Sequence, residues 1–469
     1  MHITRPRAAG TPTVRAAPAP APARSVAAVR AGAGLGVLTF LAYLPGLGRT
    51  LDFDSAHTVG MFVKPGPPWA AFSSQAAFNN HPFFSFLEQL VRVVTGRTDA
   101  ATMRVLPILC AAAAVGVLTW FAARRHGLPA GLVAGALLAS NPTFATLSRG
   151  VRGYSLLVLC AIVATVLAVD DRPGRSGWWD AAYVLVAGAG LATHLYMFPV
   201  LAAHVGLVAA RRGLDARWRL RLAGAACVAV VAYAGMAASM IDTMGSYSRV
   251  LKADLPWQVA LMATGGGWAS AAALPLVVAG GLLVLRRDRA ARGASAALAA
   301  VLLVQWAGLQ SSALTPRFFV WLVPGAAYLA AVAVGRVRAA AVLGAASCAV
   351  AAWALAPGFT GHPTAYRHTA ALIREVNAAG GRSCVVNIGV SPMLAYLDSP
   401  RDFTAVTDPA QLDSCDAVFV ASWWPTDAGW YARDRQVIAD AERRFPHRLE
   451  IMVGDPTLVL SSEPLTPPA

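Results

Sequence analysis

Acidic residues are scarce in this chain of 469 residues, and charged side chains are nearly absent from its long apolar stretches. Asp and Glu number 24 against 39 Lys and Arg, which gives a formal net charge of +15 at neutral pH. Charges within a membrane span mark proton and ion pathways, so their near absence argues against such a pathway. The chain also lacks a Gly-rich nucleotide-binding motif, because Gly265-Gly266-Gly267 predicts a flexible loop.

Apolar residues, in contrast, make up 57% of the chain. Crossing the hydrocarbon core as a helix takes roughly 20 mostly apolar residues, because the backbone must form its own hydrogen bonds there. The stretches that are long enough lie near residues 31–49, 102–122, 128–147, 153–169, 178–195, 197–210, 220–240, 268–285, 294–313, 318–335 and 338–356. The sequence therefore predicts an all-α polytopic membrane bundle of about 11 transmembrane helices.

Arg clusters fall at every second gap between these spans, and short loops rich in Lys and Arg stay in the cytoplasm. The clusters comprise Arg5, Arg7, Arg15, Arg24 and Arg30; Arg124 and Arg125; Arg172 and Arg175; Arg211, Arg212, Arg217, Arg219 and Arg221; Arg286, Arg287, Arg289 and Arg292; and Arg336 and Arg338. Counting spans puts all of them on one side. We therefore expect a multi-pass protein of the cell membrane with a cytoplasmic N-terminus and an external C-terminus. The positive charge is then a topology signal, and no nucleic-acid partner is expected.

The chain divides into three predicted parts. A Pro/Ala-rich tail, residues 1–30, is expected to be disordered, and the span after it lacks a clear cleavage site and should remain as an anchor. Residues 31–356 form the transmembrane domain, whose first external loop, 50–101, carries most of the unusual residues. Residues 357–469 alternate strand-like and helix-like runs, which predicts a small external α/β domain.

The strand-like runs of this external domain are Cys384–Val390, Ala417–Ser422 and Leu449–Val453, and the helix-like runs are Thr369–Ala379 and Arg435–Arg444. An oxidising exterior would allow a disulfide between Cys384 and Cys415, and two separate buried thiols are an equal alternative. The cysteines within the spans are expected to be packing residues. These are Cys110, Cys160, Cys227 and Cys348.

The first external loop opens with two carboxylates and an imidazole, Asp52, Asp54 and His57, directly after the first span. A reaction on a lipid-linked substrate would need such groups at this membrane surface. One Asp in a partly desolvated cleft can accept a proton from an attacking hydroxyl, which is general-base chemistry. The alternative is that these residues only cap a helix at the interface.

Later in the same loop, Asn79-Asn80-His81-Pro82 precedes an amphipathic run, Ser85–Val94. Its apolar residues lie on one face, with Glu88, Gln89 and Arg92 elsewhere. This pattern predicts a helix that lies along the membrane surface in contact with membrane lipids.

Cations and rings recur at the external ends of later spans. Arg149 and the motif Arg152-Gly153-Tyr154 precede the fourth span, Thr193-His194 ends the fifth, and Arg317-Phe318-Phe319 opens the tenth. Two Arg at an external interface run against the positive-inside trend and indicate an anionic partner, and a planar guanidinium suits a phosphate. The alternatives are Arg side chains that reach lipid headgroups and a histidine that only packs.

Taken together, these motifs resemble the GT-C superfamily of integral-membrane glycosyltransferases, in particular the branch of the protein O-mannosyltransferases and the bacterial lipid A aminoarabinose transferases. The resemblance covers about residues 30–330 and depends on the order, spacing and shared external side of the motifs. They are Phe53-Asp54-Ser55-Ala56-His57, His81-Pro82 with its surface helix, Arg152-Gly153-Tyr154, Thr193-His194 and Arg317-Phe318-Phe319.

The resemblance implies the GT-C fold and a donor sugar carried on a polyprenyl phosphate, whose anomeric carbon an acceptor hydroxyl or amine attacks with inversion. The family's general base maps to Asp54 by the Asp-x-x-His pattern, with Asp52 as the fallback. The family often has Asp-Glu where this chain has Asp54-Ser55, and Arg-Pro-Tyr where it has Arg152-Gly153-Tyr154. Mannose is the family-level expectation for the sugar, and a glycan, a lipid or a protein outside the membrane is open as the acceptor.

Each candidate residue thereby has an expected role. Asp54 is catalytic, while Arg152, Arg317, Arg149 and His194 bind the donor phosphate, and His57, His81 and Tyr154 contact the substrate. Cations that stabilise the departing phosphate would supply much of the catalysis. Some relatives use a divalent metal, but no spaced cluster of His and Glu demands one here, so no essential metal or other cofactor is predicted.

Two other classes of protein fit part of the pattern. A transporter or flippase of lipid-linked glycans could also use interfacial Arg residues, but transporters place broken helices and polar residues near the midplane, often in repeated halves, and no repeat is visible. An inactive scaffold that binds a partner through its external domain would be favoured if replacing Asp54 had no effect.

Overall fold

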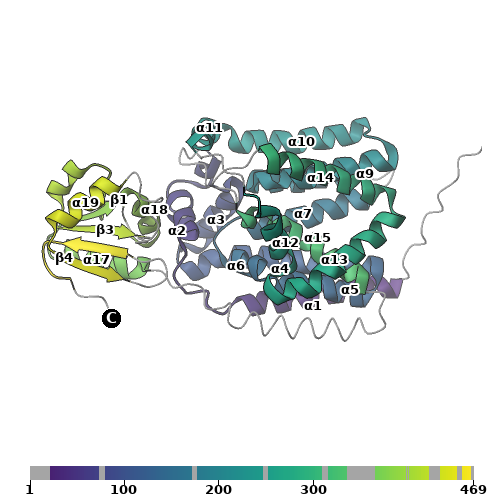
Figure 1. The fold of residues 1–469 in the computed structure, drawn as a ribbon, viewed down its shortest axis with the longest axis horizontal. Coiled ribbons are helices and arrows are strands. Elements are labelled where there is room, and N and C mark those ends of the chain that lie inside the picture. Colours follow the sequence, from purple (N-terminus) through teal and green to yellow (C-terminus); the bar gives the residue numbers. More distant parts are fainter. Residues whose placement is uncertain are drawn as a thin grey trace, which may run out of the picture.

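A computed structural model gives the architecture. It describes residues 22–72, 80–171, 177–246, 252–308, 315–334, 365–397, 399, 401–421, 434–451 and 457–465. A bundle of helices forms most of the molecule, and a small mixed sheet with its own helices lies at one end of the bundle (Figure 1).

The helices of the bundle occupy the predicted spans, except that the first begins at Pro22, within the tail 1–30 that was predicted to be disordered. They are α1 Pro22–Tyr43, α4 Ala100–His126, α5 Leu128–Ser140, α6 Pro142–Arg149, α7 Tyr154–Val169, α8 Gly177–Thr193, α9 Phe198–Arg212, α10 Ala216–Tyr233, α13 Gly267–Arg287, α14 Arg289–Gly308 and α15 Val323–Val334. Among the described residues, five helices are long and apolar enough to cross a membrane, or six if α5 and α6 count as one span. The prediction of a polytopic helical bundle is thus confirmed. The predicted span 338–356 lies outside the described residues.

Two predicted spans are interrupted where the chain cannot continue a regular helix. The axes of α5 and α6 meet at 61°. Asn141 ends α5 and accepts the backbone N–H of Phe144 at 2.9 Å, and Pro142, which has no N–H, starts the new helix. Likewise α8 ends at Thr193, and the 3₁₀ turn η4, Leu195–Met197, leads into α9.

The Arg clusters meet at one end of the bundle, which we call the arginine-rich end. Arg124 and Arg125 of α4 pair with Asp170 after α7, and Arg212 at the end of α9 pairs with Asp171. The structure therefore confirms that these clusters share one side. The clusters at Arg172, Arg175, Arg336 and Arg338, and Arg5, Arg7 and Arg15 of the tail, lie outside the described residues.

The predicted surface helix is α3, Pro82–Thr95, but its burial is the reverse of what the polar residues suggested. Glu88 and Gln89 are fully buried, whereas Val93 and Val94 are 59% and 84% exposed. Gln89 donates to the Phe62 carbonyl at 2.5 Å, and burial raises the pKa of Glu88 well above its usual range. The face with Phe84, Glu88 and Gln89 thus packs on the protein, while Val93 and Val94 near the end of the helix are exposed.

The sheet domain has five strands in the order β2-β1-β3-β5-β4. They are β1 Ser383–Val386, β2 Thr404–Val406, β3 Ala417–Ala421, β4 His447–Ile451 and β5 Thr457–Ser461. β1 pairs in parallel with β2 and β3, and β5 pairs antiparallel with β3 and β4. Its helices are α17 Tyr366–Ala378, α18 Asn387–Tyr396 and α19 Arg435–Arg444.

These elements confirm a small α/β domain and correct one of its boundaries. The strand expected over Cys384–Val390 ends at Val386, and the chain turns into α18. Pro392 lies inside α18, and the helix has no amphipathic pattern, so local sequence does not predict it. Its packing against the first loop, described below, stabilises a helix at this position.

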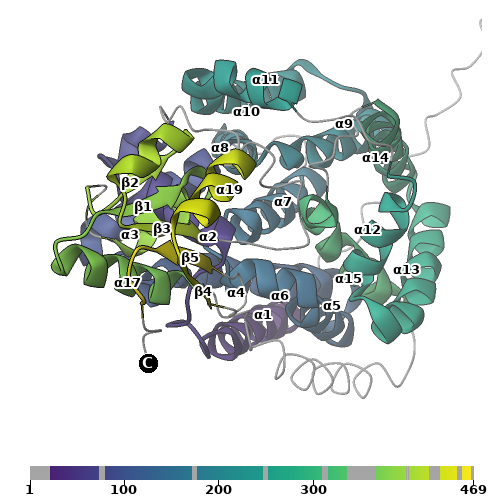
Figure 2. The same cartoon turned by 60° about the vertical axis from the view of Figure 1, so that its left-hand side comes forward.

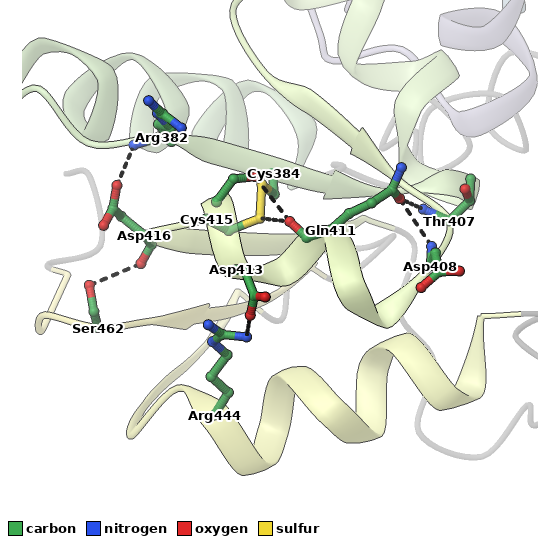
Figure 3. The surroundings of a disulfide bond; sticks show 11 residues. Arg382, Cys384, Thr407, Asp408, Gln411, Asp413, Cys415, Asp416, Arg444 and Ser462 are labelled. Atoms are coloured by element: carbon green, nitrogen blue, oxygen red, sulfur yellow. Dashed lines mark hydrogen bonds and ion pairs between the residues drawn. A yellow bond between two sulfur atoms is a disulfide. The ribbon is translucent and has the colours of Figure 1, made fainter.

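The two cysteines of the sheet domain form a disulfide, Cys384–Cys415, which decides between the two alternatives (Figure 3). It links β1 to the end of the 3₁₀ helix η7, Pro409–Ser414. Of the cysteines in the spans, Cys110 and Cys160 are buried as expected, whereas Cys227 is exposed. Cys348 lies outside the described residues.

The sheet domain contacts the bundle through α18, which packs against α2, Phe53–Thr58, and the π-helical turn η1, Val59–Val63. The Leu51 N–H donates to the Tyr396 hydroxyl at 2.6 Å, and Lys64 Nζ donates to the Leu397 carbonyl at 2.8 Å. In Figure 2 the sheet domain projects over α2 and α3, with α12, Leu255–Thr264, and α13 on the other side. The domain therefore covers the segment that carries the predicted catalytic residues.

Candidate active site

The candidate site begins at α2, the short helix directly after the first span. Asp52 is its N-cap, with one carboxylate oxygen accepting the Ser55 N–H at 2.8 Å and the other the Ser55 hydroxyl at 3.0 Å. An Asp in this position satisfies backbone donors that the first turn of a helix leaves unpaired. The capping alternative raised for this segment thus applies to Asp52, and Asp54 lies one residue inside the helix.

Asp54 meets Arg317, which lies 263 residues away in sequence. Arg317 Nη1 donates to Asp54 Oδ2 at 2.6 Å, and their side chains are 41% and 21% exposed. Arg317 is in the 3₁₀ helix η6, Pro316–Leu322, which precedes α15 and also packs against α12. The fold therefore joins two predicted site residues in one ion pair.

Arg152 lies in the link between α6 and α7, and it contacts α2 through Thr58. Its side chain is 4% exposed, and Nη1 donates to the Thr58 hydroxyl at 3.2 Å. Thr58 in turn donates to the backbone carbonyl of Asp54 at 2.9 Å. One hydroxyl thus connects the buried guanidinium to the residue that carries the candidate base.

Gly153 explains one departure from the family pattern. A Cβ atom at this position would lie 2.6 Å from the Thr193 methyl group and 3.2 Å from the His81 ring. A residue with a Cβ, proline included, would therefore clash with these side chains. The glycine brings the Arg152-Gly153-Tyr154 motif close to two other predicted motifs.

Three rings pack together behind Arg152. His81 lies 5.3 Å from Tyr154 and 5.0 Å from His194, and Tyr154 lies 5.6 Å from His194, all between ring centroids. His81 Nδ1 donates to the Thr193 carbonyl at 3.0 Å, since a carbonyl can only accept. His194 Nδ1 instead accepts the Tyr196 N–H at 3.1 Å, so its proton is on Nε2. The Thr193-His194 and His81-Pro82 motifs are thus parts of one cluster.

The histidines of the site are held neutral. Burial, with help from the Arg152 charge, lowers the pKa of His57 to about 4, although Asp54 opposes the shift. Burial and the Arg152 charge also lower the pKa of His81 well below its usual range, and burial with both guanidiniums lowers that of His194 to about 3. His57 packs between Phe53 and Phe62. At neutral pH, therefore, the positive charge comes from the arginines and not from these rings.

Arg149 is the one predicted site residue that the fold places apart. Its guanidinium lies over the Tyr43 ring at 5.8 Å, and Nε donates to the Ala145 carbonyl at 3.3 Å within α6. Burial lowers the pKa of Arg149, Tyr43 opposes this shift, and the charges of Arg104 and Arg49 add to it. The structure therefore brings together all the predicted residues except Arg149.

Arg104, near the start of α4, is a residue that the sequence analysis missed. It is 7% exposed and donates to four backbone carbonyls, those of Leu47, Arg49, Thr50 and Arg149, at 2.6 to 2.9 Å. It thereby ties the chain before Asp52 to the chain before Arg152. An Arg at an external interface was the signal that singled out Arg149, and the same signal would have found Arg104.

Within the described part of the chain, no three His, Cys, Asp or Glu side chains lie close enough together to hold a metal ion. The site brings a carboxylate, Asp54, together with two guanidiniums, those of Arg317 and Arg152. A carboxylate can accept a proton, and guanidiniums stabilise phosphate charge, so the arrangement suits attack by a hydroxyl with departure of a phosphate.

The sequence matches no protein-family model and no curated protein. Its fold matches that of ArnT from Cupriavidus metallidurans in the apo state, with a TM-score of 0.61 and 16% identity over 92% of this chain and 97% of that chain. For ArnT bound to undecaprenyl phosphate the TM-score is 0.59, with 14% identity and the same coverage. For the Archaeoglobus fulgidus oligosaccharyltransferase in complex with Zn and sulfate it is 0.53, with 11% identity over 91% and 71%. These are GT-C proteins. The chain has the GT-C fold.

The GT-C fold confirms the architecture that the motifs implied, a many-helix membrane bundle with the first loop and a small external-type domain at one end. At identities of 11 to 16%, the similarity shows the fold of this chain but not its activity or its substrate. The function is therefore argued from the site.

Proposed function

We propose that this protein is a membrane glycosyltransferase that transfers a sugar from a polyprenyl-phosphate donor to an acceptor on the external face of the membrane, with Asp54 as the general base. The observation that supports this most is the ion pair between Asp54 and Arg317, with Arg152 connected to the same short helix through Thr58. A carboxylate and two guanidiniums at a membrane surface match the two charges that such a transfer creates. These are a proton on the acceptor and a phosphate on the leaving lipid.

In the proposed reaction, the acceptor oxygen or nitrogen attacks the anomeric carbon as the bond from that carbon to the phosphate oxygen breaks. Asp54 takes the acceptor proton, and the polyprenyl phosphate leaves with the bonding electrons. A direct attack from the face opposite the phosphate inverts the anomeric carbon. The leaving group is already activated, so stabilisation of the phosphate charge by Arg152 and Arg317 supplies much of the catalysis.

The ion pair adds an order to these events. Arg317 Nη1 lies 2.6 Å from Asp54 Oδ2. A donor phosphate would compete for the same guanidinium and release the carboxylate to act as base. His194 beside Arg152 would add a hydrogen-bond donor, Nε2–H, for the phosphate, and His57, His81 and Tyr154 would shape the sugar site. Arg149, which lies over Tyr43, is the weakest of the proposed phosphate ligands.

The orientation of the chain is also part of the proposal. The disulfide Cys384–Cys415 lies in the domain that covers the site, and disulfides persist in oxidising compartments. The arginine-rich end is at the other end of the bundle and suits the cytoplasm. Both signals support an external site and C-terminus and a cytoplasmic N-terminus.

For the sugar and the acceptor we propose chemical classes only. Mannose is our first choice of sugar, and a glycan, a lipid or a protein outside the membrane can be the acceptor. We also propose that no divalent metal is essential, so that transfer should continue after treatment with a chelator.

The test is sugar transfer from labelled polyprenyl-phosphate donors to envelope acceptors, in membranes that carry the wild type or the Asp54→Asn variant at matched expression. We expect the variant to lose activity by about 10²- to 10⁴-fold, the usual size of a general-base contribution. The labelled fraction would identify the acceptor class.

Asp52→Asn is the matched control, because Asn caps a helix about as well as Asp and the change removes a neighbouring carboxylate. It should keep most of the activity. If Asp52→Asn were inactive and Asp54→Asn active, the base would be Asp52. If no donor gave a product, or if the two variants and the wild type were equal, the transferase proposal would fail and a transporter or flippase would become the better reading.

A further inference from the structure

Two buried hydroxyl groups lie between α2 and the link that carries Arg152. Ser55 and Thr58 are three residues apart on α2, so they lie on the same face of the helix. Their exposed fractions are 0% and 1%. Each hydroxyl makes one hydrogen bond to the link and a second one to α2 or its N-cap.

Ser55 acts on the backbone of the link. Its hydroxyl accepts the Val151 N–H at 2.9 Å and donates to Asp52 Oδ2 at 3.0 Å. Thr58 acts on the side chain of the next residue, since its hydroxyl accepts from Arg152 Nη1 at 3.2 Å and donates to the Asp54 carbonyl at 2.9 Å. We call Ser55 and Thr58 the hydroxyl pair.

We propose that the hydroxyl pair are positioning residues that set the distance and orientation of Arg152 relative to Asp54. The inference rests on the proposed function, in which Asp54 takes the acceptor proton and Arg152 stabilises the departing phosphate. Ser55 fixes where the link begins, through Val151, and Thr58 fixes where the guanidinium points. Both act from the helix that carries the base.

Hydroxyl groups suit this role because each can accept one hydrogen bond and donate another at the same time. An acidic side chain at the position of Ser55 would behave differently. A carboxylate there could accept from Val151 but, when ionised, could not also donate to Asp52. The serine therefore makes both hydrogen bonds at once, to the Val151 N–H and to the Asp52 carboxylate, which an ionised acid cannot do.

The experiment compares Thr58→Val with Thr58→Ser in the purified full-length protein. Val has nearly the shape of Thr and lacks the hydroxyl, whereas Ser keeps it. Sugar transfer gives kcat and the donor KM, and the shift of the unfolding temperature with added undecaprenyl phosphate reports phosphate binding without catalysis. Thr119→Val is the matched control, because Thr119 is fully buried and its hydroxyl donates to the Val115 carbonyl of its own helix at 2.8 Å.

We expect Thr58→Val to lower kcat by about 10- to 100-fold, the size of effect that a misplaced group produces. Both guanidiniums are still present and charged, so the undecaprenyl phosphate midpoint should change less than about threefold. Thr58→Ser should restore kcat to within about threefold of the wild type. Ser55→Ala should also lower kcat, by about 10-fold, and Thr119→Val should not.

Equal kcat values for Thr58→Val and the wild type would overturn the proposal. So would a Thr58→Val protein that unfolds at lower temperature and binds undecaprenyl phosphate poorly, because the hydroxyl would then be needed only for folding. In either case an inactive Asp54→Asn variant would leave the transferase proposal standing. A wild type without transfer would remove the proposed function itself.

Discussion

The two ends of the bundle use arginine in different ways. At the arginine-rich end, four aspartates of the described residues pair with five arginines, and one of these pairs joins Asp215 to Arg212. Asp170 contacts Arg124 and Arg125, Asp171 contacts Arg212 and Arg221, and Asp180 contacts Arg217 and Arg221. At the site end, Asp54 contacts Arg317, while Arg152 is held by a hydroxyl and lies among neutral rings. At the arginine-rich end the arginines pair with carboxylates. At the site end one arginine, Arg317, pairs with a carboxylate, and the other, Arg152, contacts a hydroxyl.

The two ends differ in what their arginines do: the first group stabilises the helix bundle, and the second surrounds the candidate active site. Burial acts to raise the pKa of Asp171, but hydrogen bonds from Arg221 and Arg212 outweigh it and lower the pKa. That network links α8, α9 and α10 to the end of α7 and has its charges satisfied within the protein. At the site end the fold instead keeps guanidinium charge near a carboxylate and three neutral histidines, which leaves the site suited to a further anion.

Among the variants that test this difference, Arg221→Leu should have the largest effect on stability. Arg221 and Asp171 side chains are each 2% exposed, and removing one partner of a buried pair leaves the other charge without full compensation. We expect the free energy of unfolding to fall by about 3 to 5 kcal/mol. Transfer per folded molecule should be unchanged. Thermal unfolding in detergent and transfer assays on the folded fraction measure the two quantities.

Arg219→Leu is the control for this variant, because Arg219 lies on the same helix and is exposed. It should cost little. A loss of transfer per folded molecule in Arg221→Leu would contradict the comparison, since it would connect the arginine-rich end to the chemistry.

A second, smaller effect concerns the sheet domain that covers the site. The disulfide Cys384–Cys415 closes a loop with a sequence separation of 31 residues. Replacing both cysteines by serine should lower the stability of this domain by about 2 to 4 kcal/mol. Protease digestion should then cut the sheet domain before the bundle. Cys227→Ser, which changes an exposed cysteine in the bundle, should leave the digestion pattern as it is.

The sequence predicted which residues gather at the site better than it predicted what each of them does. Counting spans placed Asp54 and Arg317 on the same side of the membrane, and they form an ion pair across 263 residues. The residue types alone did not distinguish Asp52 from Asp54, and only the Asp-x-x-His pattern of the resemblance ranked Asp54 first, because capping depends on the backbone geometry of α2. Arg149 and Arg152 were equally ambiguous, since three residues of an irregular link decide which guanidinium faces Thr58 and which faces Tyr43.

Elements held by distant contacts were the least predictable part of the fold. The helix α18 contains Pro392 and lacks an amphipathic pattern, and it packs on α2, which is more than 300 residues earlier. Glu88 looks like a surface residue in the helical pattern of α3, yet it is fully buried. No local rule reveals either feature, because both depend on which surface of the molecule lies opposite.

The smallest expected effect is a pH dependence that comes from the neutral rings of the site end. The pKa of His57 is lowered to about 4 by burial and by Arg152, against Asp54, from an ordinary value of 6.5. Between these two values the unfolded chain binds more protons than the folded chain, so stability rises with pH and is lost as pH falls through this window. For this one residue the loss from pH 7 to pH 5 should be about 1 to 2 kcal/mol.

The variant His57→Phe tests this assignment, because a phenyl ring fits between Phe53 and Phe62 and cannot be protonated. Unfolding temperatures at pH 5 and pH 7 should differ less in this variant than in the wild type, while His447→Gln, which changes an exposed histidine of β4, should keep the wild-type difference. An unchanged difference in His57→Phe would mean that His57 is not the neutral ring described here. His81, whose pKa is also lowered by burial, would then become the main source of acid sensitivity at the site end.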